Sequence, residues 1–319
     1  MNSRAAEPEA FQVSEGERSK RRARRVRWIV LVLVFALVGS LGCKSFTNSV
    51  LLHPTSRAIR TDATRMEFTG KSDAIAGQRV EAFYKEYGVG DAEPELFVLA
   101  LTGNAGRAES MHSISAALFE TWLGTGAAPS RIGVLSLQYP GYGVAAEGDA
   151  SLESMAAAAV EAVGFLRTRA QSRPIIIQAL SMGTVAALHS ARVCDSNEVQ
   201  GLILAKPPNL GPMLMGEYGW WNMWLIAYPM ALQLPDCARS SENAAAIEGL
   251  PALFLIAEAD QLVLPEYAGQ VFDAFGGPKR RIALPGDHNT TVWSTTCPEL
   301  DAGLDWLWGE VRSTGTGTH

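Results

Sequence analysis

One serine stands between an apolar run and a helix-like run near the middle of this chain. Residues 174–178 read Pro-Ile-Ile-Ile-Gln and are typical of a buried strand, and residues 184–188 are typical of a helix. The turn between them reads Ala-Leu-Ser-Met-Gly. A sharp turn of this kind lifts the Ser181 hydroxyl clear of the sheet edge, where a basic partner activates it. The pattern predicts a strand, a turn with a nucleophilic serine, and a helix.

An acid and a histidine follow the serine in the chain order that a serine–acid–histidine triad on such a sheet requires. An apolar run at 251–257 opens into a loop that contains Asp260, and a second run at 280–284 leads into His288. Of the five histidines, only His288 lies in a glycine-containing loop directly after a strand. Alone, it would be read as a loop histidine paired with a backbone carbonyl. The ordered set predicts Ser181 as nucleophile, His288 as base and Asp260 as the orienting acid.

Three carboxylates compete for the role of that acid. Asp260 lies a few residues past the end of its strand, where a carboxylate reaches the Nδ1 atom of a histidine on the next loop. Glu258 follows the strand immediately, and Asp287 would have to fold back on its neighbour His288. Each of the three is otherwise read as a solvated loop carboxylate. The position of Asp260 favours it.

A glycine-containing loop follows another buried strand-like run. Residues 95–101 form the run, and residues 102–106 read Thr-Gly-Asn-Ala-Gly. Glycines let the backbone turn so that N–H groups point at the space above a nucleophile, as an oxyanion hole requires. We expect the N–H groups of Asn104 and of Met182, the residue after the serine, to form this hole. Without the triad, the same loop would be read as an ordinary turn.

In chain order, these motifs resemble those of the membrane-tethered α/β-hydrolase-domain family, a group similar to the fungal bud-emergence protein and the animal ABHD serine hydrolases. The resemblance covers roughly residues 51–312 and rests on residues 102–106, 138–143, 179–183, Asp260 and 286–289. It implies an α/β-hydrolase fold and serine-hydrolase activity.

Two residues depart from the pattern of that family. Thr102 begins the oxyanion loop where the family usually has histidine, and Ala179 begins the serine motif where glycine is usual. Neither change removes a reacting group. Ala179 adds one methyl group to the turn, whereas Thr102 is expected to change how the oxyanion loop is braced.

The alternation of strand-like and helix-like runs predicts the α/β class, with a mostly parallel central sheet covered by helices on both faces. The chain has 319 residues and is 47% hydrophobic, which suffices for one large core. We expect an N-terminal segment at 1–43 and one α/β-hydrolase domain at 44–319, with a small helical cap inserted at about 206–248. Apolar residues at helical spacing predict helices within 149–169 and 300–308.

The N-terminus has the order of a secretory signal. A basic run at 18–27 precedes an apolar run at 28–41, and Gly42 and Cys43 follow. The apolar run is short, because a helix that spans a bilayer needs about 20 residues. Three interpretations stay open: a lipoprotein with a lipidated Cys43, an uncleaved signal anchor, and full secretion. All three place the catalytic domain outside the cytosol, and the first two predict a membrane-anchored protein of the cell envelope.

Charge argues against a nucleic-acid partner. Residues 1–42 carry eight Lys/Arg and four Asp/Glu, a net charge of +4, so residues 43–319 carry −10 and the whole chain −6. Such a domain lacks the clustered Lys and Arg that neutralise phosphates. The sequence holds no phosphate-cradling or metal-ligand motif, so we expect no cofactor and no metal. Cys194, Cys237 and Cys297 allow one disulfide in an oxidising compartment or remain buried thiols.

An aromatic stretch before Pro235 is the candidate substrate pocket. Its members include Trp220, Trp221, Trp224 and Tyr228, interleaved with methionines. Insertions after the sixth strand cover the nucleophile in the fold that the resemblance implies, and adaptable Met with large aromatic faces suits an acyl or other apolar group. Packing of a cap helix against the sheet is the commoner origin of such a stripe.

Together these features predict a serine hydrolase that cleaves carboxylic esters or thioesters, including lipid acyl groups, through an acyl-enzyme. Its partners would be a small-molecule or lipid acyl substrate and, through the N-terminus, a membrane. An amidase or peptidase with the same triad is the close alternative. A non-catalytic binding or scaffold protein of the same fold is the alternative from another class, and the intact set of reacting residues argues against it.

Overall fold

A computed structural model describes residue 22 and residues 24–30, 47–144, 147–218, 224–290 and 298–315. The chain divides into two units, residues 1–46 and residues 47–319. In the smaller unit, residues 24–30 are helical and exposed. Cys43 and residues 31–42 lie outside the described residues. None of the helices that the structure describes is both long and apolar enough to span a bilayer.

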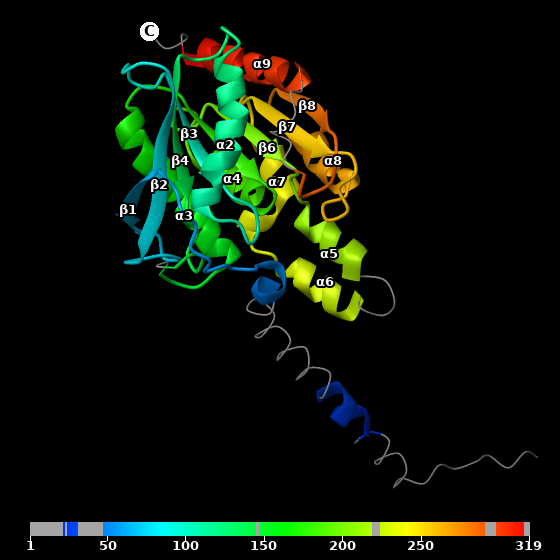
Figure 1. Ribbon diagram of the computed structural model, residues 1–319. Helices are drawn as coiled ribbons and strands as arrows, with labels where there is room; N and C mark the ends of the chain where they lie inside the picture. The colour runs from blue at the N-terminus through cyan, green and yellow to red at the C-terminus, as the bar shows by residue number, and fades with distance from the viewer. Residues whose placement is uncertain are drawn as a thin grey trace, which may run out of the picture. The chain divides into compact units, whose positions relative to one another are not determined.

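An eight-stranded sheet forms the centre of the larger unit (Figure 1). The strands lie in the order β1-β2-β4-β3-β5-β6-β7-β8. β2 pairs with β1 and β4 in antiparallel fashion, and all other neighbours are parallel. The strands are β1 Thr64–Thr69, β2 Arg79–Gly88, β3 Leu96–Leu101, β4 Arg131–Leu137, β5 Ile175–Leu180, β6 Gly201–Ala205, β7 Ala252–Ala257 and β8 Lys279–Leu284.

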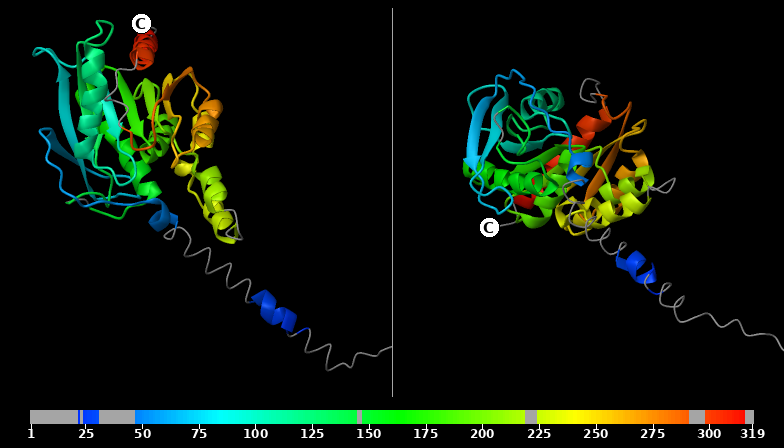
Figure 2. Two further views of the ribbon diagram at one scale, coloured as in Figure 1. Left: turned by 45° about the vertical axis from the view of Figure 1, so that its right-hand side comes forward. Right: turned by 90° about the horizontal axis from the view of Figure 1, so that it is seen from below.

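Helices connect the parallel strands and cover both faces of the sheet (Figure 2). α2 and α9 pack on one face, and α3, α4 and α8 pack on the other. The helical elements are α2 Ala108–Leu123, α3 Leu152–Ala170, α4 Met182–Val193, α5 Leu210–Tyr218, α6 Trp224–Leu232, the 3-10 turn η1 Asp236–Ala238, α7 Ser240–Ala245, α8 Pro265–Ala274 and α9 Pro298–Gly315.

The central strand β3 shows why the strands read as continuous apolar runs rather than as alternating ones. All six of its residues are buried. Val98 and Ala100 belong to the apolar cluster beneath α2 and α9, whereas Leu99 and Leu101 belong to the cluster beneath α3 and α4. A sheet that is covered on both faces requires apolar side chains at every position.

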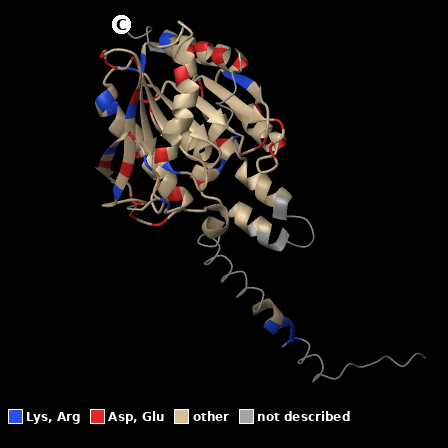
Figure 3. Cartoon of the chain, viewed as in Figure 1, with Lys and Arg blue, Asp and Glu red and all other residues tan. Residues whose placement is uncertain are grey.

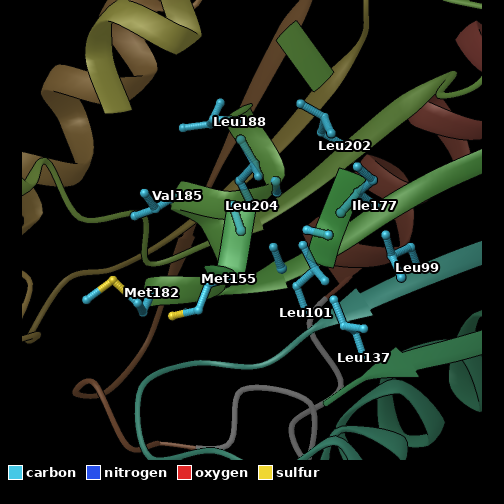
Figure 4. Close-up of a cluster of buried hydrophobic side chains, with 14 of the residues drawn as sticks. Leu99, Leu101, Leu137, Met155, Ile177, Met182, Val185, Leu188, Leu202 and Leu204 are labelled. Atoms are coloured by element: carbon cyan, nitrogen blue, oxygen red, sulfur yellow. The ribbon is translucent and has the colours of Figure 1, made fainter. Parts of the chain in front are cut away.

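The larger of the two clusters lies between the sheet and the helices that carry and flank the serine turn. Figure 4 shows Leu99 and Leu101 of β3 together with Met155 of α3 and with Val185 and Leu188 of α4. Burying an apolar side chain of this size contributes roughly 1.5–3 kcal/mol. This packing fixes the position of α4, and with it the turn between β5 and α4.

α3 begins within the stretch in which the sequence predicts a helix. The Ser151 side chain accepts a hydrogen bond from the N–H of Ser154, and the Ser154 hydroxyl accepts one from the N–H of Ser151. This reciprocal capping box satisfies two N–H groups that would otherwise have no partner at the start of the helix.

The elements α5, α6, η1 and α7 lie between β6 and β7, in the range predicted for the cap. The sequences of α5 and α6 hold a single charged residue, Glu217, and the parts of these helices that are coloured in Figure 3 are tan. On these helices, Tyr228 and Leu232 are exposed, whereas Leu214 and Met230 are buried. The cap is therefore an apolar helical insertion at the end of β6.

The predicted α/β class, the mostly parallel sheet and the two helical layers are confirmed. The carboxyl ends of parallel strands meet at one edge of the sheet, which is where ligand sites of such sheets form. The loops that follow β3, β5, β6, β7 and β8 all lie at this edge. Every residue predicted for the triad and the oxyanion hole belongs to one of these loops or to the start of α4.

Candidate active site

Ser181 occupies the sharp turn between β5 and α4. Its backbone has φ 49° and ψ −121°, a conformation that L-residues seldom adopt. The Ser181 N–H donates to the carbonyl of Ala205 on β6, which ties the turn to the neighbouring strand (2.8 Å). Gly183 is required next to it, because a Cβ atom there would lie 2.6 Å from the carbonyl oxygens of Leu101 and Thr102. The expected strained turn is present.

His288 links the serine to an acid. Its Nε2 atom lies 3.0 Å from the Ser181 Oγ atom, and its Nδ1 atom lies 2.7 Å from Asp260 Oδ2. A carboxylate only accepts hydrogen bonds, so Nδ1 carries the proton and Nε2 accepts from the serine hydroxyl. The structure thus brings together the three residues that the sequence predicts as a triad, although they are far apart in the chain.

Asp260 is almost fully buried, with 1% of its surface exposed. Its second oxygen, Oδ1, accepts the N–H groups of Leu262 (2.9 Å) and Val263 (2.8 Å). Burial raises the pKa of this carboxyl, but hydrogen bonds from His288, Val263 and Leu262 outweigh it and leave the pKa below the ordinary value. Asp260 is therefore a fixed anion that holds one tautomer and one orientation of the imidazole.

The two competing carboxylates have other surroundings. Glu258 is exposed. Asp287 is also exposed, and its Oδ1 atom accepts hydrogen bonds from the N–H groups of Asn289 and Thr290 and from the Thr290 hydroxyl. The Thr290 hydroxyl is the main cause of a lowered pKa of Asp287. Asp287 therefore shapes the loop that carries His288, and it is Asp260 that contacts the imidazole.

The loop after β3 lies against the serine, as the sequence predicts for an oxyanion hole. Asn104 and Met182 line the same cavity as Ser181. Within the described residues, no hydrogen bond joins the N–H of Asn104 or of Met182 to another protein group. Both N–H groups are therefore available to an oxygen atom of a ligand. Gly106 keeps the loop compact, since a Cβ atom there would overlap the Thr102 hydroxyl.

The side chain of Asn104 fixes this loop through partners that the sequence did not reveal. Its Oδ1 atom accepts from the N–H of His53 (2.8 Å) and from the Tyr142 hydroxyl (3.2 Å). Its Nδ2 atom donates to the Leu51 carbonyl (2.6 Å) and to His53 Nδ1 (3.0 Å). These partners lie 38 to 53 positions away in the chain, and the sequence gives no sign that they contact Asn104.

Two cavities adjoin Ser181. One of about 300 Å³ is lined mainly by apolar side chains: Leu51, Leu210, Met213, Leu214, Leu262 and Val263. The other, of about 250 Å³, has a mixed lining: Lys206, Asn289 and Thr290 are polar, whereas Ile114, Leu180 and Leu262 are apolar. The serine therefore lies between a mainly apolar cavity and a mixed one.

The aromatic residues predicted for the pocket are placed only in part. Trp220 and Trp221 lie outside the described residues, and so does the side chain of Trp224. Tyr228 is on α6, with 53% of its surface exposed. The described lining of the apolar cavity instead comes from α5, from the loop after β7 and from Val50 and Leu51.

Of the cysteines that could form a disulfide, the structure describes Cys194 and Cys237. Cys194 is a free thiol whose pKa burial raises to about 12. The Cys237 thiol donates to the Leu152 carbonyl (3.7 Å). Cys43 and Cys297 lie outside the described residues.

Known structures share this architecture. An esterase of Pyrococcus furiosus, Pf2001, is 14% identical with a TM-score of 0.57, and the match covers 81% of this chain and 98% of that one. DcsB, in complex with its substrate analogue, is 16% identical with a TM-score of 0.55, covering 80% and 100%. A thermophilic esterase of Thermogutta terrifontis is 16% identical with a TM-score of 0.52, covering 78% and 99%.

The sheet order, the strained serine turn and these neighbours define the fold: the chain has the α/β-hydrolase fold. No protein-family model matches the sequence, and no curated protein matches it either. These solved structures are only 14–16% identical to this chain, so they establish its fold alone.

Proposed function

We propose that this chain is a serine hydrolase that cleaves carboxylic esters or thioesters. The observation that carries the proposal is the hydrogen-bonded series Asp260, His288 and Ser181. The serine occupies a strained turn, beside two N–H groups that have no partner among the described residues. A carbonyl group bound above Ser181 would have its carbon within reach of the Ser181 Oγ atom and its oxygen within reach of those N–H groups. This is the arrangement that acyl transfer requires.

In the proposed reaction, the Ser181 Oγ atom attacks the carbonyl carbon while His288 Nε2 takes the hydroxyl proton. Asp260 stabilises the imidazolium that forms, and the N–H groups of Asn104 and Met182 hold the oxyanion. The imidazolium then gives its proton to the leaving alkoxide or thiolate, which leaves an acyl-enzyme. Water, deprotonated by His288, attacks this intermediate and releases the acid and free Ser181.

The apolar cavity supports an acyl group as the part of the substrate that is bound. Its volume of about 300 Å³ lies at the lower end of the range of ligand pockets. We therefore propose short to medium acyl chains, with lipid acyl groups of that length included, and a leaving group in the cavity of mixed lining beside Asn289 and Thr290.

A panel of p-nitrophenyl esters tests the proposal. With full-length protein in detergent, kcat/KM should rise from acetyl to medium acyl chains and fall for palmitoyl. Leu214→Trp, which fills the apolar cavity, should lower kcat/KM for the medium chains and leave the acetyl ester nearly unchanged. Equal hydrolysis by wild type and Ser181→Ala would contradict the proposed function.

We further propose that the chain is related to the membrane-tethered α/β-hydrolase-domain family and that its N-terminus attaches it to a membrane. The shared motifs, the basic run at 18–27, the apolar run at 28–41 and Cys43 support this. An acyl chain contributes about 0.8 kcal/mol per buried CH₂. Full-length protein should incorporate a palmitate analogue and sediment with membranes, and Cys43→Ser should weaken both. If the wild type incorporates no palmitate analogue and Cys43→Ser sediments as the wild type does, the lipoprotein proposal is wrong and an uncleaved anchor is the remaining interpretation.

A further inference from the structure

Lys206 is a buried lysine directly after β6, with 3% of its surface exposed. Its Nζ atom donates to three carbonyl oxygens of the histidine loop: those of His288 (2.7 Å), Asp287 (3.0 Å) and Thr290 (3.1 Å). A lysine ammonium has three N–H donors and no acceptor. All of its donors are therefore occupied by the loop that carries His288.

Burial of the Lys206 ammonium is unfavourable for the stability of the fold. Burial lowers the pKa of its ammonium, and the charges of Asp260 and Asp287 oppose that change. Among the described residues it has no carboxylate within ion-pair distance. A buried cation that is held by carbonyls alone costs stability unless those hydrogen bonds are well formed.

The backbone of Lys206 is strained as well. Its φ of 54° lies in the left-handed region that favours glycine. The N–H of Lys206 donates to the Leu255 carbonyl on β7 (2.8 Å), so the strained residue is fixed between two strands. Strained residues of this kind collect at functional sites, and Lys206 lines the same cavity as Ser181 and His288.

We propose that Lys206 is a positioning residue: its ammonium binds three carbonyls of the histidine loop and so holds the imidazole in line with Ser181 and Asp260. The inference rests on the proposed hydrolase mechanism. The ammonium has no lone pair and no spare N–H, so it acts through His288 and not on the substrate. The charged groups around it are Asp260 after β7 and Asp287 on the loop itself.

Lys279 provides a matched control in the same chain. Its Nζ atom also donates to three carbonyls, those of Phe272 (2.7 Å), Phe275 (2.9 Å) and Asp273 (3.0 Å). It lies at the first position of β8, at the edge of the sheet opposite to Ser181. Lys279 is half-buried and also lies over the Phe272 ring, 4.9 Å from its centroid. Its replacement shows what the loss of three lysine–carbonyl bonds does at a position far from Ser181.

The test measures the rate of covalent labelling of full-length protein by a fluorophosphonate. Lys206→Met should lower this rate by about 10- to 100-fold, since a small displacement of a catalytic group has an effect of that size. Lys206→Arg should restore part of the rate, because a guanidinium also donates several hydrogen bonds. Lys279→Met should leave the rate unchanged.

The labelling experiment distinguishes failure of the role proposed for Lys206 from failure of the proposed function. Labelling of Lys206→Met at the wild-type rate would overturn the inference while the proposed function stands, whereas a wild type that is not labelled would overturn the proposed function itself. If Lys206→Met does not fold, Lys206→Gln carries the same test, because it also lacks the charge. If neither folds, Lys206 serves only the fold and the inference is wrong.

Discussion

Ser181, Ala105 and Lys206 all have a positive φ, between 49° and 56°, and all follow strands that end at the same edge of the sheet. Such conformations cost of order 1–3 kcal/mol each and persist where the surrounding packing fixes them. Ser181 was predictable, because a lone serine between a strand and a helix is a local pattern. Lys206 was not, because its partners lie 81 to 84 positions away and meet it only through the pairing of β6, β7 and β8.

Replacement of the acid gives a prediction at the residue scale. Asp260→Asn should lower kcat for p-nitrophenyl esters by about 10⁴-fold, because the amide no longer fixes the required tautomer of His288. Glu258→Gln should have little effect, since that side chain is exposed. Asp287→Asn should have an intermediate effect through the loop. Steady-state kinetics of the three variants check the order, and a larger loss for Asp287→Asn than for Asp260→Asn would refute the assignment.

The lowered pKa of Asp260 also predicts a dependence of stability on pH. Because the folded-state pKa lies below the ordinary value of 3.8, the ionised carboxylate stabilises the folded protein above that value, and this contribution disappears as the pH falls through the lowered pKa. The difference in Tm between wild type and Asp260→Asn should therefore be greatest above about pH 5 and shrink towards pH 2. A difference that is constant across this range would contradict the lowered pKa.

At the scale of elements, the oxyanion loop after β3 depends on the segment at 47–55. Leu51 and His53 bind the Asn104 side chain, and the Thr55 carbonyl accepts from the N–H of Gly143 (2.8 Å). The sequence predicted the loop itself from its glycines. The expectation that Thr102 changes the bracing stays a prediction. The contacts to the Asn104 side chain come from the segment at 47–55 and from Tyr142.

Asn104→Ala tests this bracing, because it keeps the backbone N–H and removes only the side-chain contacts. We expect kcat to fall by about 10-fold with little change in KM, less than the loss of an oxyanion donor itself. Asn197→Ala, on an exposed residue, serves as the control. Steady-state kinetics of both variants test this. Equal kcat values for Asn104→Ala and Asn197→Ala would mean that the segment at 47–55 does not support the loop.

At the scale of the whole molecule, the fold class followed from the sequence because strands buried on both faces leave a clear signal of uninterrupted apolar runs. The order of the strands and the way in which it brings Lys206 to the histidine loop required the structure. The cap was located from its position between β6 and β7, but its contribution to the cavity comes from Leu210, Met213 and Leu214 on α5. The aromatic stretch before Pro235, which suggested the pocket in the sequence, does not indicate that α5 lines the cavity.

The proposed role of Ser181 as the nucleophile of an acyl-transfer site can be tested by intact-mass spectrometry. The full-length protein is treated with a fluorophosphonate, and the modified residue is located by peptide mapping. We expect one adduct per chain, located on Ser181, and none in a folded Ser181→Ala variant with an unchanged circular dichroism spectrum. An adduct that persists in Ser181→Ala, or a wild type that remains unmodified, would contradict it.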